Sequence, residues 1–210
     1  GGPALHALGY AERAGLLTKI ADVLSANRAA YFEIALANSG SPESDASIDI
    51  DGAIFTLKYY ARIGAALGSA RYLKDGELVR LAKDEAFQSL HISQPLRGAA
   101  ILINAFNFPA WGLWEKAAPA LLSAVPVLAK PATATAWLTQ RMVEDVVKAG
   151  VLPEGALSIV CGSAGDLLDH VTGADVVSFT GSAETALRIR GHAAVLRNST
   201  RVNVEAGSMS

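Results

Sequence analysis

The amino-acid sequence predicts an α/β fold, in which a mostly parallel sheet with helices on both faces follows a helical N-terminal segment. Beyond residue 98, short apolar runs alternate with helical segments, a pattern typical of βαβ units. These runs are apolar throughout, as expected for strands that are buried on both faces. Before residue 86, most apolar residues instead recur at helical spacing. The predicted sheet is therefore Rossmann-like and preceded by N-terminal helices.

The N-terminal part, residues 1–86, is predicted as a helical segment that packs on the α/β domain. Helical spacing over residues 10–38 ends at Asn38-Ser39-Gly40, and the Pro42 that follows disfavours continuation. A second helix is predicted over 47–67. From residue 87 the pattern changes to β-rich runs at 89–94 and 98–103, which predict a pair of adjacent strands.

The α/β domain is predicted over residues 87–210. Its further elements are a helix at 111–123, a strand at 125–130, a helix at 135–149, a strand at 157–160, a short helix at 165–171, a strand at 176–179, a helix at 183–191 and a strand at 201–205. Ligands bind outside the carboxyl ends of parallel strands. Function is therefore expected at the residues that end these strands, namely Asn104, Lys130, Gly162, Thr180-Gly181-Ser182 and Glu205.

Composition excludes several classes of partner and site. The 210 residues carry 18 Lys and Arg against 20 Asp and Glu, a net charge of −2, so a nucleic acid is a poor candidate partner. No apolar run is long and uninterrupted enough to predict a membrane span. The single cysteine, Cys161, cannot form an intrachain disulfide or a cysteine-rich zinc site. We therefore expect a cytoplasmic protein without a metal site.

The common nucleotide and hydrolase motifs are absent from the sequence, including G-x-G-x-x-G, the phosphate loop and G-x-S-x-G. Two glycine-bearing helix starts remain, at Gly162–Gly165 and at Thr180-Gly181-Ser182. The free N–H groups of the second suit a phosphate, but Ser182 could equally be a plain N-cap. Lys130 ends an apolar strand and should reach a cleft and meet oxygens, since a buried unpaired ammonium is costly. Together these features predict a phosphorylated ligand.

Five short motifs carry a family resemblance. The run Ile103-Asn104-Ala105-Phe106-Asn107-Phe108-Pro109 resembles the N-F-P motif of the aldehyde dehydrogenase superfamily. The runs 127–132, 149–155, 179–182 and 204–206 resemble further motifs of that family, in its order and with its approximate spacing. Finer details are similar to the semialdehyde dehydrogenases of aromatic-acid breakdown, in the phenylacetate and benzoyl-CoA pathways. Those enzymes act on semialdehydes that carry a CoA thioester and are associated with NADP.

The resemblance implies roles for individual residues. Asn107 matches the side-chain amide that holds the oxyanion, and Glu205 matches the glutamate that activates water. Without the resemblance, Asn107 could simply turn the chain and Glu205 could be an ordinary strand-end carboxylate. Partial desolvation is expected to raise the pKa of Glu205. The implied cofactor-binding residues are Ile103, Ala105, Phe106, Lys130, Ala132, Thr133, Gly165, Phe179, Thr180, Gly181 and Ser182.

The cofactor expected from the resemblance is NADP, with NAD as the alternative. NAD-preferring relatives often carry a glutamate three residues after the lysine, where this chain has Thr133. A carboxylate there would repel the 2′-phosphate of NADP, and a threonine does not.

The sequence departs from the family pattern at its C-terminal end. The nucleophilic cysteine of the family lies downstream of the base glutamate, and Cys161 sits at a different position, before Gly162. The closing run from Gly207 also differs from the subgroup. We therefore expect an N-terminal fragment, inactive alone, of a homo-oligomeric enzyme that oxidises an aldehyde, in particular a CoA-linked semialdehyde, to the acid. The alternatives are a non-catalytic nucleotide-binding fragment or subunit, and an interaction protein that retains only the fold.

Overall fold

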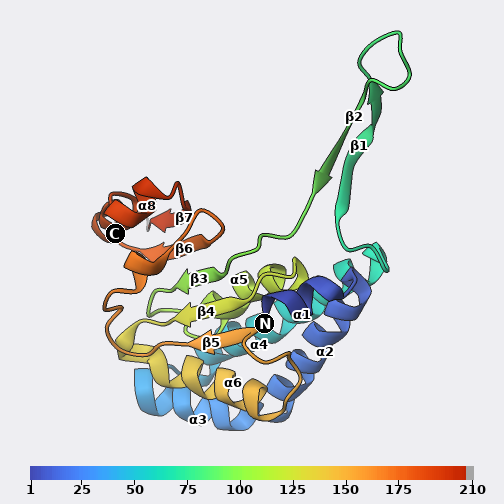
Figure 1. Cartoon of the computed structure of the whole chain (residues 1–210). Helices are drawn as coiled ribbons and strands as arrows, with labels where there is room; N and C mark the ends of the chain where they lie inside the picture. Colours follow the sequence, from blue (N-terminus) through green and yellow to red (C-terminus); the bar gives the residue numbers. More distant parts are fainter. Residues whose placement is uncertain (207–210) are drawn as a thin grey trace.

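A five-stranded parallel sheet forms the centre of the computed structural model, which describes residues 1–206 (Figure 1). The strand order is β5-β4-β3-β6-β7, and each neighbouring pair is parallel. The strands are β3 (Ala100–Ile103), β4 (Val127–Lys130), β5 (Leu157–Ile159), β6 (Val176–Gly181) and β7 (Arg201–Ala206). The predicted α/β class with a parallel sheet is confirmed.

The chain winds outward from β3 in both directions. It first runs through α5 (Trp111–Leu122) to β4, and then through a 3-10 turn (Thr133–Thr135) and α6 (Ala136–Lys148) to β5. It then returns to β6, beside β3, and continues through α7 (Ala183–Arg190) and α8 (Ala193–Arg197) to β7. The reversal of direction lies between β3 and β6, which is where open α/β sheets bind ligands.

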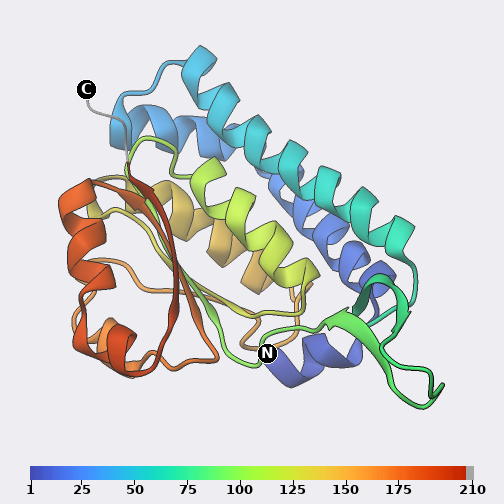
Figure 2. The same ribbon diagram turned by 90° about the horizontal axis from the view of Figure 1, so that it is seen from above.

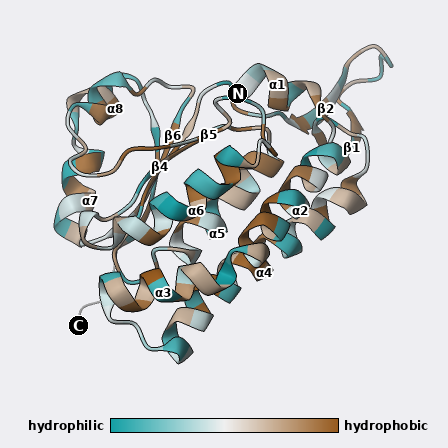
Figure 3. Cartoon of the chain, turned by 90° about the horizontal axis from the view of Figure 1, so that it is seen from below, coloured by the Kyte–Doolittle hydropathy of each residue, from teal (hydrophilic) through white to brown (hydrophobic). Residues whose placement is uncertain are grey.

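Helices cover both faces of the sheet, with α5 and α6 on one face and α7 and α8 on the other (Figure 2). Alternate residues of β3 enter different cores: Ala100 and Leu102 pack on the α5 side, and Ile101 packs with Val177 and Phe179 on the α7 side. This double burial explains why the strands are apolar throughout. Brown and teal alternate along α2, α4 and α6 in Figure 3, as expected for helices with one buried face.

The N-terminal helices are α1 (Gly2–Ala7), α2 (Tyr10–Ala26), α3 (Arg28–Ser39) and α4 (Glu43–Leu67). The single helix predicted over 10–38 is therefore wrong, because it is divided at Asn27. The Asn27 side-chain amide donates to the Val23 carbonyl at 3.0 Å, so it pairs with a carbonyl in the last turn of α2. The sequence patterns also missed α1 and α8, and the short helix predicted at 165–171 is a 3-10 turn, Leu167–His170.

Arg13 ties α2 to α5 through a buried guanidinium. Its side chain is 1% exposed; Nε donates to the Leu122 carbonyl at 2.7 Å, and Nη1 donates to the Leu8 carbonyl at 2.5 Å. The guanidinium also lies 4.4 Å from the centre of the Tyr10 ring. Carbonyls at a helix end are natural acceptors for such a cation. The contact therefore joins the N-terminal helices to the sheet layer.

A separate antiparallel hairpin, β1 (Leu73–Arg80) and β2 (Gln88–Ser93), extends away from the rest of the molecule (Figure 1). The predicted pairing of runs 89–94 and 98–103 is wrong, because β2 pairs with β1 and β3 pairs with β4 and β6. The apolar β3 needs burial on both faces, which the exposed arm cannot provide.

The expected boundary at residue 86 falls in the connection between β1 and β2. The division into segments 1–86 and 87–210 stays a prediction. The sequence departure at Gly207 lies outside the described residues. Across residues 1–206, every helix is too short or too polar to cross a membrane.

The helix α5 receives its N-terminal cap from α4. Asp49 is 6% exposed, and its carboxylate accepts hydrogen bonds from Trp111 N at 2.7 Å and from Ala110 N at 3.1 Å. Ala110, at the N-cap position, has no acceptor side chain of its own. Burial raises the pKa of Asp49 from 3.8 to about 6, against the opposing effect of the two N–H donors.

The raised pKa of Asp49 predicts a specific pH dependence of stability. The unfolded chain releases this proton near pH 4 and the folded chain releases it near pH 6, so ionisation destabilises the fold across that window. Relative to Asp49→Asn, which keeps an acceptor without titrating, the wild type should lose about 2 kcal/mol of unfolding free energy between pH 4 and pH 6. Urea unfolding of both proteins measures the difference. If the wild type instead gains stability relative to Asp49→Asn as the pH rises, the N–H donors outweigh desolvation.

Candidate functional site

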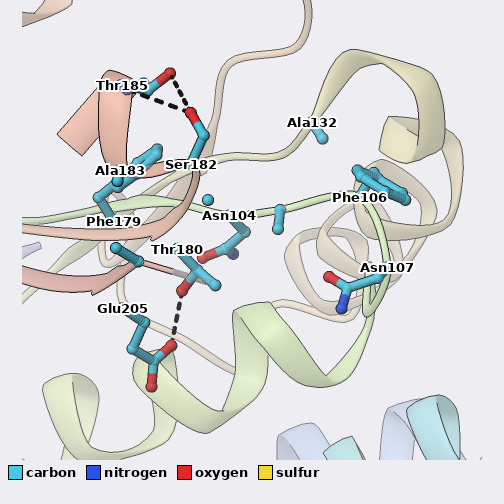
Figure 4. Close-up of a pocket in the computed structure, with 13 residues that line it drawn as sticks. Asn104, Phe106, Asn107, Ala132, Phe179, Thr180, Ser182, Ala183, Thr185 and Glu205 are labelled. Atoms are coloured by element: carbon cyan, nitrogen blue, oxygen red, sulfur yellow. Dashed lines mark hydrogen bonds between the residues drawn. The ribbon is translucent and has the colours of Figure 1, made fainter. Parts of the chain in front are cut away.

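A cavity of about 1000 Å³ lies at the carboxyl edge of the sheet, between β3 and β6. It is lined by loop residues that follow β3, by the end of β6 and the start of α7, and by the end of β7 (Figure 4). The residues expected to be functional that line this cavity are Asn104, Ala105, Phe106, Asn107, Ala132, Phe179, Thr180, Gly181, Ser182 and Glu205.

The sheet register brings Asn107 and Glu205 to the same cavity. Ile103 pairs with Phe179, and Thr180 pairs with Glu205, so the ends of β3, β6 and β7 are level with one another. A smaller cavity of about 200 Å³ adjoins this edge and is also lined by Asn107 and Glu205. The side-chain amide and the carboxylate therefore share one site, although nothing in their sequence spacing requires it.

Glu205 is held as an anion. Its Oε2 accepts a hydrogen bond from Thr180 Oγ1 at 2.8 Å and forms an ion pair with Lys116 Nζ at 3.2 Å. The hydrogen bond from the Thr180 hydroxyl lowers the pKa of Glu205 below its ordinary value, and the contact with Lys116 makes a smaller contribution in the same direction. The expectation of a raised pKa is therefore wrong, because the side chain is 64% exposed and has two donors.

The start of α7 combines a cap with a glycine that allows close approach. Ser182 Oγ accepts from Thr185 N at 3.3 Å, so the N-cap interpretation is correct; a contact with phosphate stays a prediction. A Cβ on Gly181 would lie 2.5 Å from the Phe179 ring, so a side chain there would have to displace that ring. The Phe179 ring therefore packs against the backbone at the start of α7, where a helix N-terminus favours anions.

Four of the expected cofactor residues are not among those that line the cavity. Lys130 is 8% exposed and, instead of reaching the cleft, donates from Nζ to its neighbour's carbonyl, Pro131 O, at 2.8 Å. Thr133 is exposed and its Oγ1 donates to Gly162 O at 3.3 Å. Ile103 packs into the core on the α7 side, and Gly165 lies in an exposed turn at φ +52°.

Sequence patterns missed one residue of the site, Lys116, and gave no specific role to another, Asn104. Lys116 lies on α5 and is only 14% exposed in its side chain; Nζ contacts Glu115 Oε1 at 2.6 Å as well as Glu205. Asn104 was predicted only as a strand-end residue. It is 7% exposed, and within the described chain neither Nδ2 nor Oδ1 has a hydrogen-bond partner. Such a buried unsatisfied amide costs about 1–3 kcal/mol.

The only cysteine in the sequence, Cys161, lies just beyond β5 and is exposed, away from the residues that line the cavity. Across residues 1–206, His, Cys, Asp and Glu side chains nowhere gather in the threes that could hold a metal ion. The chemical groups that the described cavity provides are therefore the Asn107 amide, the Glu205 carboxylate and the N-terminus of α7.

Comparison with known proteins matches residues 2–210 to the aldehyde dehydrogenase family. The chain is 65% identical over all its 210 residues to a 3,4-dehydroadipyl-CoA semialdehyde dehydrogenase of Aromatoleum evansii, and spans 41% of that protein's length. It is 28% identical to a D-glyceraldehyde dehydrogenase (NADP(+)) of Thermoplasma acidophilum, over 87% of this chain and 36% of the relative.

Solved structures show the same architecture. An NADP-dependent glyceraldehyde-3-phosphate dehydrogenase from Bacillus halodurans, complexed with NADP, matches with a TM-score of 0.82 and 27% identity, over 99% of this chain and 42% of that structure. A betaine aldehyde dehydrogenase from Staphylococcus aureus, in complex with NAD+, matches with a TM-score of 0.79 and 25% identity, over 95% and 38%. The family match spans almost the whole sequence, and the fold agrees with it. This chain belongs to the aldehyde dehydrogenase family.

Proposed function

We propose that this chain is the cofactor-binding part of an enzyme that oxidises a CoA-linked semialdehyde to the carboxylic acid with NADP. The observation that carries the proposal is that both Asn107 and Glu205 line the cavity of about 1000 Å³ at the strand-order reversal. The 65% identity to a dehydrogenase of a CoA semialdehyde supports the substrate class.

The two side chains have complementary tasks in this proposal. The Asn107 amide donates to the oxygen of the aldehyde carbonyl as negative charge develops on it, and a neutral donor fixed in place needs no reorganisation for that task. Glu205 accepts a proton from the water that releases the acid product. Its lowered pKa keeps the carboxylate ionised at neutral pH, so it is ready to accept that proton. The nicotinamide, when bound, supplies the hydride acceptor.

The described residues fit such a cofactor. Gly181 lets the Phe179 ring pack directly on the backbone at the start of α7, and the N-terminus of α7 offers N–H groups to a phosphate. Lys130 meets only one carbonyl oxygen, so its ammonium has further donors for ribose hydroxyls. To reach the ribose, the Lys130 Nζ would have to leave the Pro131 carbonyl and turn toward the cavity. Thr133, which lacks a charge, supports the choice of NADP over NAD.

A second candidate function is nucleotide binding without turnover. It is favoured by the position of Cys161, which is exposed and outside the cavity, so this chain by itself brings no thiolate to Asn107. Titration of the 210-residue chain with NADP, followed by an aldehyde-dependent absorbance assay, separates the two. Binding without turnover supports the second candidate for the isolated chain, whereas NADPH formation by it would contradict the need for a further nucleophile.

We also propose a cytoplasmic homo-oligomer. The β1–β2 arm supports self-association, because it extends from the molecule and exposes apolar side chains that a second copy can cover (Figure 1). These side chains include Leu78, Val79 and Ile92. The single cysteine supports a reducing compartment.

Replacement of Lys130 tests the cofactor site. Lys130→Ala should weaken NADP binding by about tenfold to a hundredfold, because the lost contact joins a charged donor to ribose hydroxyls. Isothermal titration calorimetry measures the Kd, and circular dichroism checks the fold. Lys19→Ala, on the exposed face of α2, is the matched control and should bind like the wild type. Equal affinities of wild type and Lys130→Ala would remove Lys130 from the site.

The choice between dinucleotides is tested at Thr133. Thr133→Glu should lower the NADP-to-NAD affinity ratio by about tenfold or more, because the carboxylate repels the 2′-phosphate. Ala134→Glu places the same charge on the next exposed residue and should leave the ratio close to that of the wild type. If the two variants change the ratio equally, the effect is one of overall charge and Thr133 does not select the cofactor.

The role of Asn107 is tested in a hybrid enzyme, in which residues 1–206 continue into the corresponding C-terminal part of the 65% identical dehydrogenase. Asn107→Ala should lower kcat by about a hundredfold to a thousandfold, as at other oxyanion sites, and change KM far less. Asn38→Ala, on α3, is the control. A kcat within twofold of the unmodified hybrid would show that this amide does not hold the oxyanion.

A further inference from the structure

The Asn104 side chain has no role in the folded chain as described. Both of its amide atoms are buried without a hydrogen-bond partner among the described residues, while its backbone N–H donates to Lys130 O at 3.1 Å. The main-chain bond fixes the backbone of Asn104 beside β4, and the residue is 7% exposed. Buried amides in proteins are almost always paired. The Asn104 amide is therefore available to a group that enters the site.

The register identifies the nearest polar groups. One residue beyond the Ile103–Phe179 pair, Asn104 lies level with Thr180, which in turn pairs with Glu205 on β7. Residues at the same level of parallel strands point to the same face of the sheet. Figure 4 shows Asn104 and Thr180 between Glu205 and Asn107. All four residues line the small cavity of about 200 Å³.

The helix α5 closes this cavity from the other side. Gly112 faces Asn104, whose Cβ lies 4.0 Å from the point that a Cβ of Gly112 would occupy. Lys116 and Glu115 are the charged groups of α5 that line the cavity together with Glu205. The absence of a side chain at Gly112 leaves space next to the Asn104 amide, and the described neighbours leave that amide unpaired.

In the described structure the carboxylate of Glu205 is held by groups other than Asn107. Both of its contacts, with Thr180 Oγ1 and Lys116 Nζ, are made by Oε2, and the side chain is 64% exposed. To accept a proton from a water beside Asn107, the carboxylate has to turn inward and give up the Thr180 hydroxyl. An inward carboxylate needs a replacement donor, because a buried anion without one is costly.

We propose that Asn104 is a positioning residue, whose Nδ2 donates to the Glu205 carboxylate when that side chain turns into the cavity. The inference rests on the proposed function, in which Glu205 is the base. In the hydrolytic step, Glu205 takes one proton from water, the water oxygen bonds to the acyl carbon of a cysteine thioester, and the sulfur leaves as a thiolate with its electron pair. Asn104 takes no proton and holds the base toward the attacking water.

This role has a signature that a structural role does not share. Since the amide is unpaired in the folded chain, an apolar side chain of similar size should stabilise the fold while it slows turnover. An asparagine that serves only packing would instead lose both stability and activity. The variant Asn104→Leu tests this difference, and Asn104→Ser is the smaller alternative if the leucine variant does not fold. Asn38→Leu, outside the cavity, is the matched control.

Urea unfolding of the 210-residue chain should give Asn104→Leu a midpoint at or above that of the wild type. In the hybrid enzyme, its kcat should fall by about tenfold to a hundredfold, which is the worth of a hydrogen bond to a charged group. The acidic limb of the kcat profile should move to higher pH, since loss of a donor raises the pKa of the base. NADP affinity should stay within twofold, and the Asn38→Leu control should reproduce the kcat and pH profile of the hybrid.

Three outcomes would overturn the inference: an unchanged kcat and pH limb, a loss of NADP affinity parallel to the loss of kcat, or lower stability of both Asn104 variants together with lower activity. Glu205→Gln in the same hybrid separates failure of the inference from failure of the proposed function. If Glu205→Gln abolishes turnover and Asn104→Leu does not impair it, only the role of Asn104 is wrong. If Glu205→Gln retains full turnover, Glu205 is not the base and both proposals fail.

Discussion

The parallel pairing of β3 with β6 is the contact on which the site depends. These strands are far apart in the chain, and each is followed by a different functional segment: the loop with Asn107 after β3, and the start of α7 after β6. Their register sets the level of Asn104, Thr180 and Glu205 at one edge. A slip of one residue would turn each of these side chains to the opposite face. The geometry of the cavity is therefore a consequence of strand register.

A second chain of contacts runs through the helices. Asp49 of α4 caps α5, and α5 presents Lys116 to Glu205. Arg13 fixes the other end of α5 through the Leu122 carbonyl. The N-terminal helices thus set the position and the electrostatic environment of the carboxylate, although none of them contributes a residue to the large cavity. The helix α5 therefore links the packing of the N-terminal helices to the charge environment of Glu205.

Sequence patterns predicted the alternation of strands and helices because double burial leaves a local signal, such as the run Val127–Lys130. They missed β1, since Leu73–Arg80 is exposed and carries charged residues, and therefore assigned β2 the wrong partner. The short motifs indicated Asn107 after β3 and Glu205 near the end of β7, and both residues line the cavity; their roles stay a prediction. The lowered pKa of Glu205 could not be predicted from sequence, because it depends on Thr180 and Lys116, which lie in other elements. The unpaired amide of Asn104 is likewise a property of packing and not of local sequence.

The central claim is that the strand-order reversal, and not another surface, holds the nicotinamide next to Asn107 and Glu205. A crystal structure of the chain with NADP bound measures this directly. The expected result is a nicotinamide ring in the cavity between β3 and β6, with the phosphates at the start of α7. A dinucleotide bound on the other side of the molecule, with Asn107 and Glu205 left in solvent, would contradict the account.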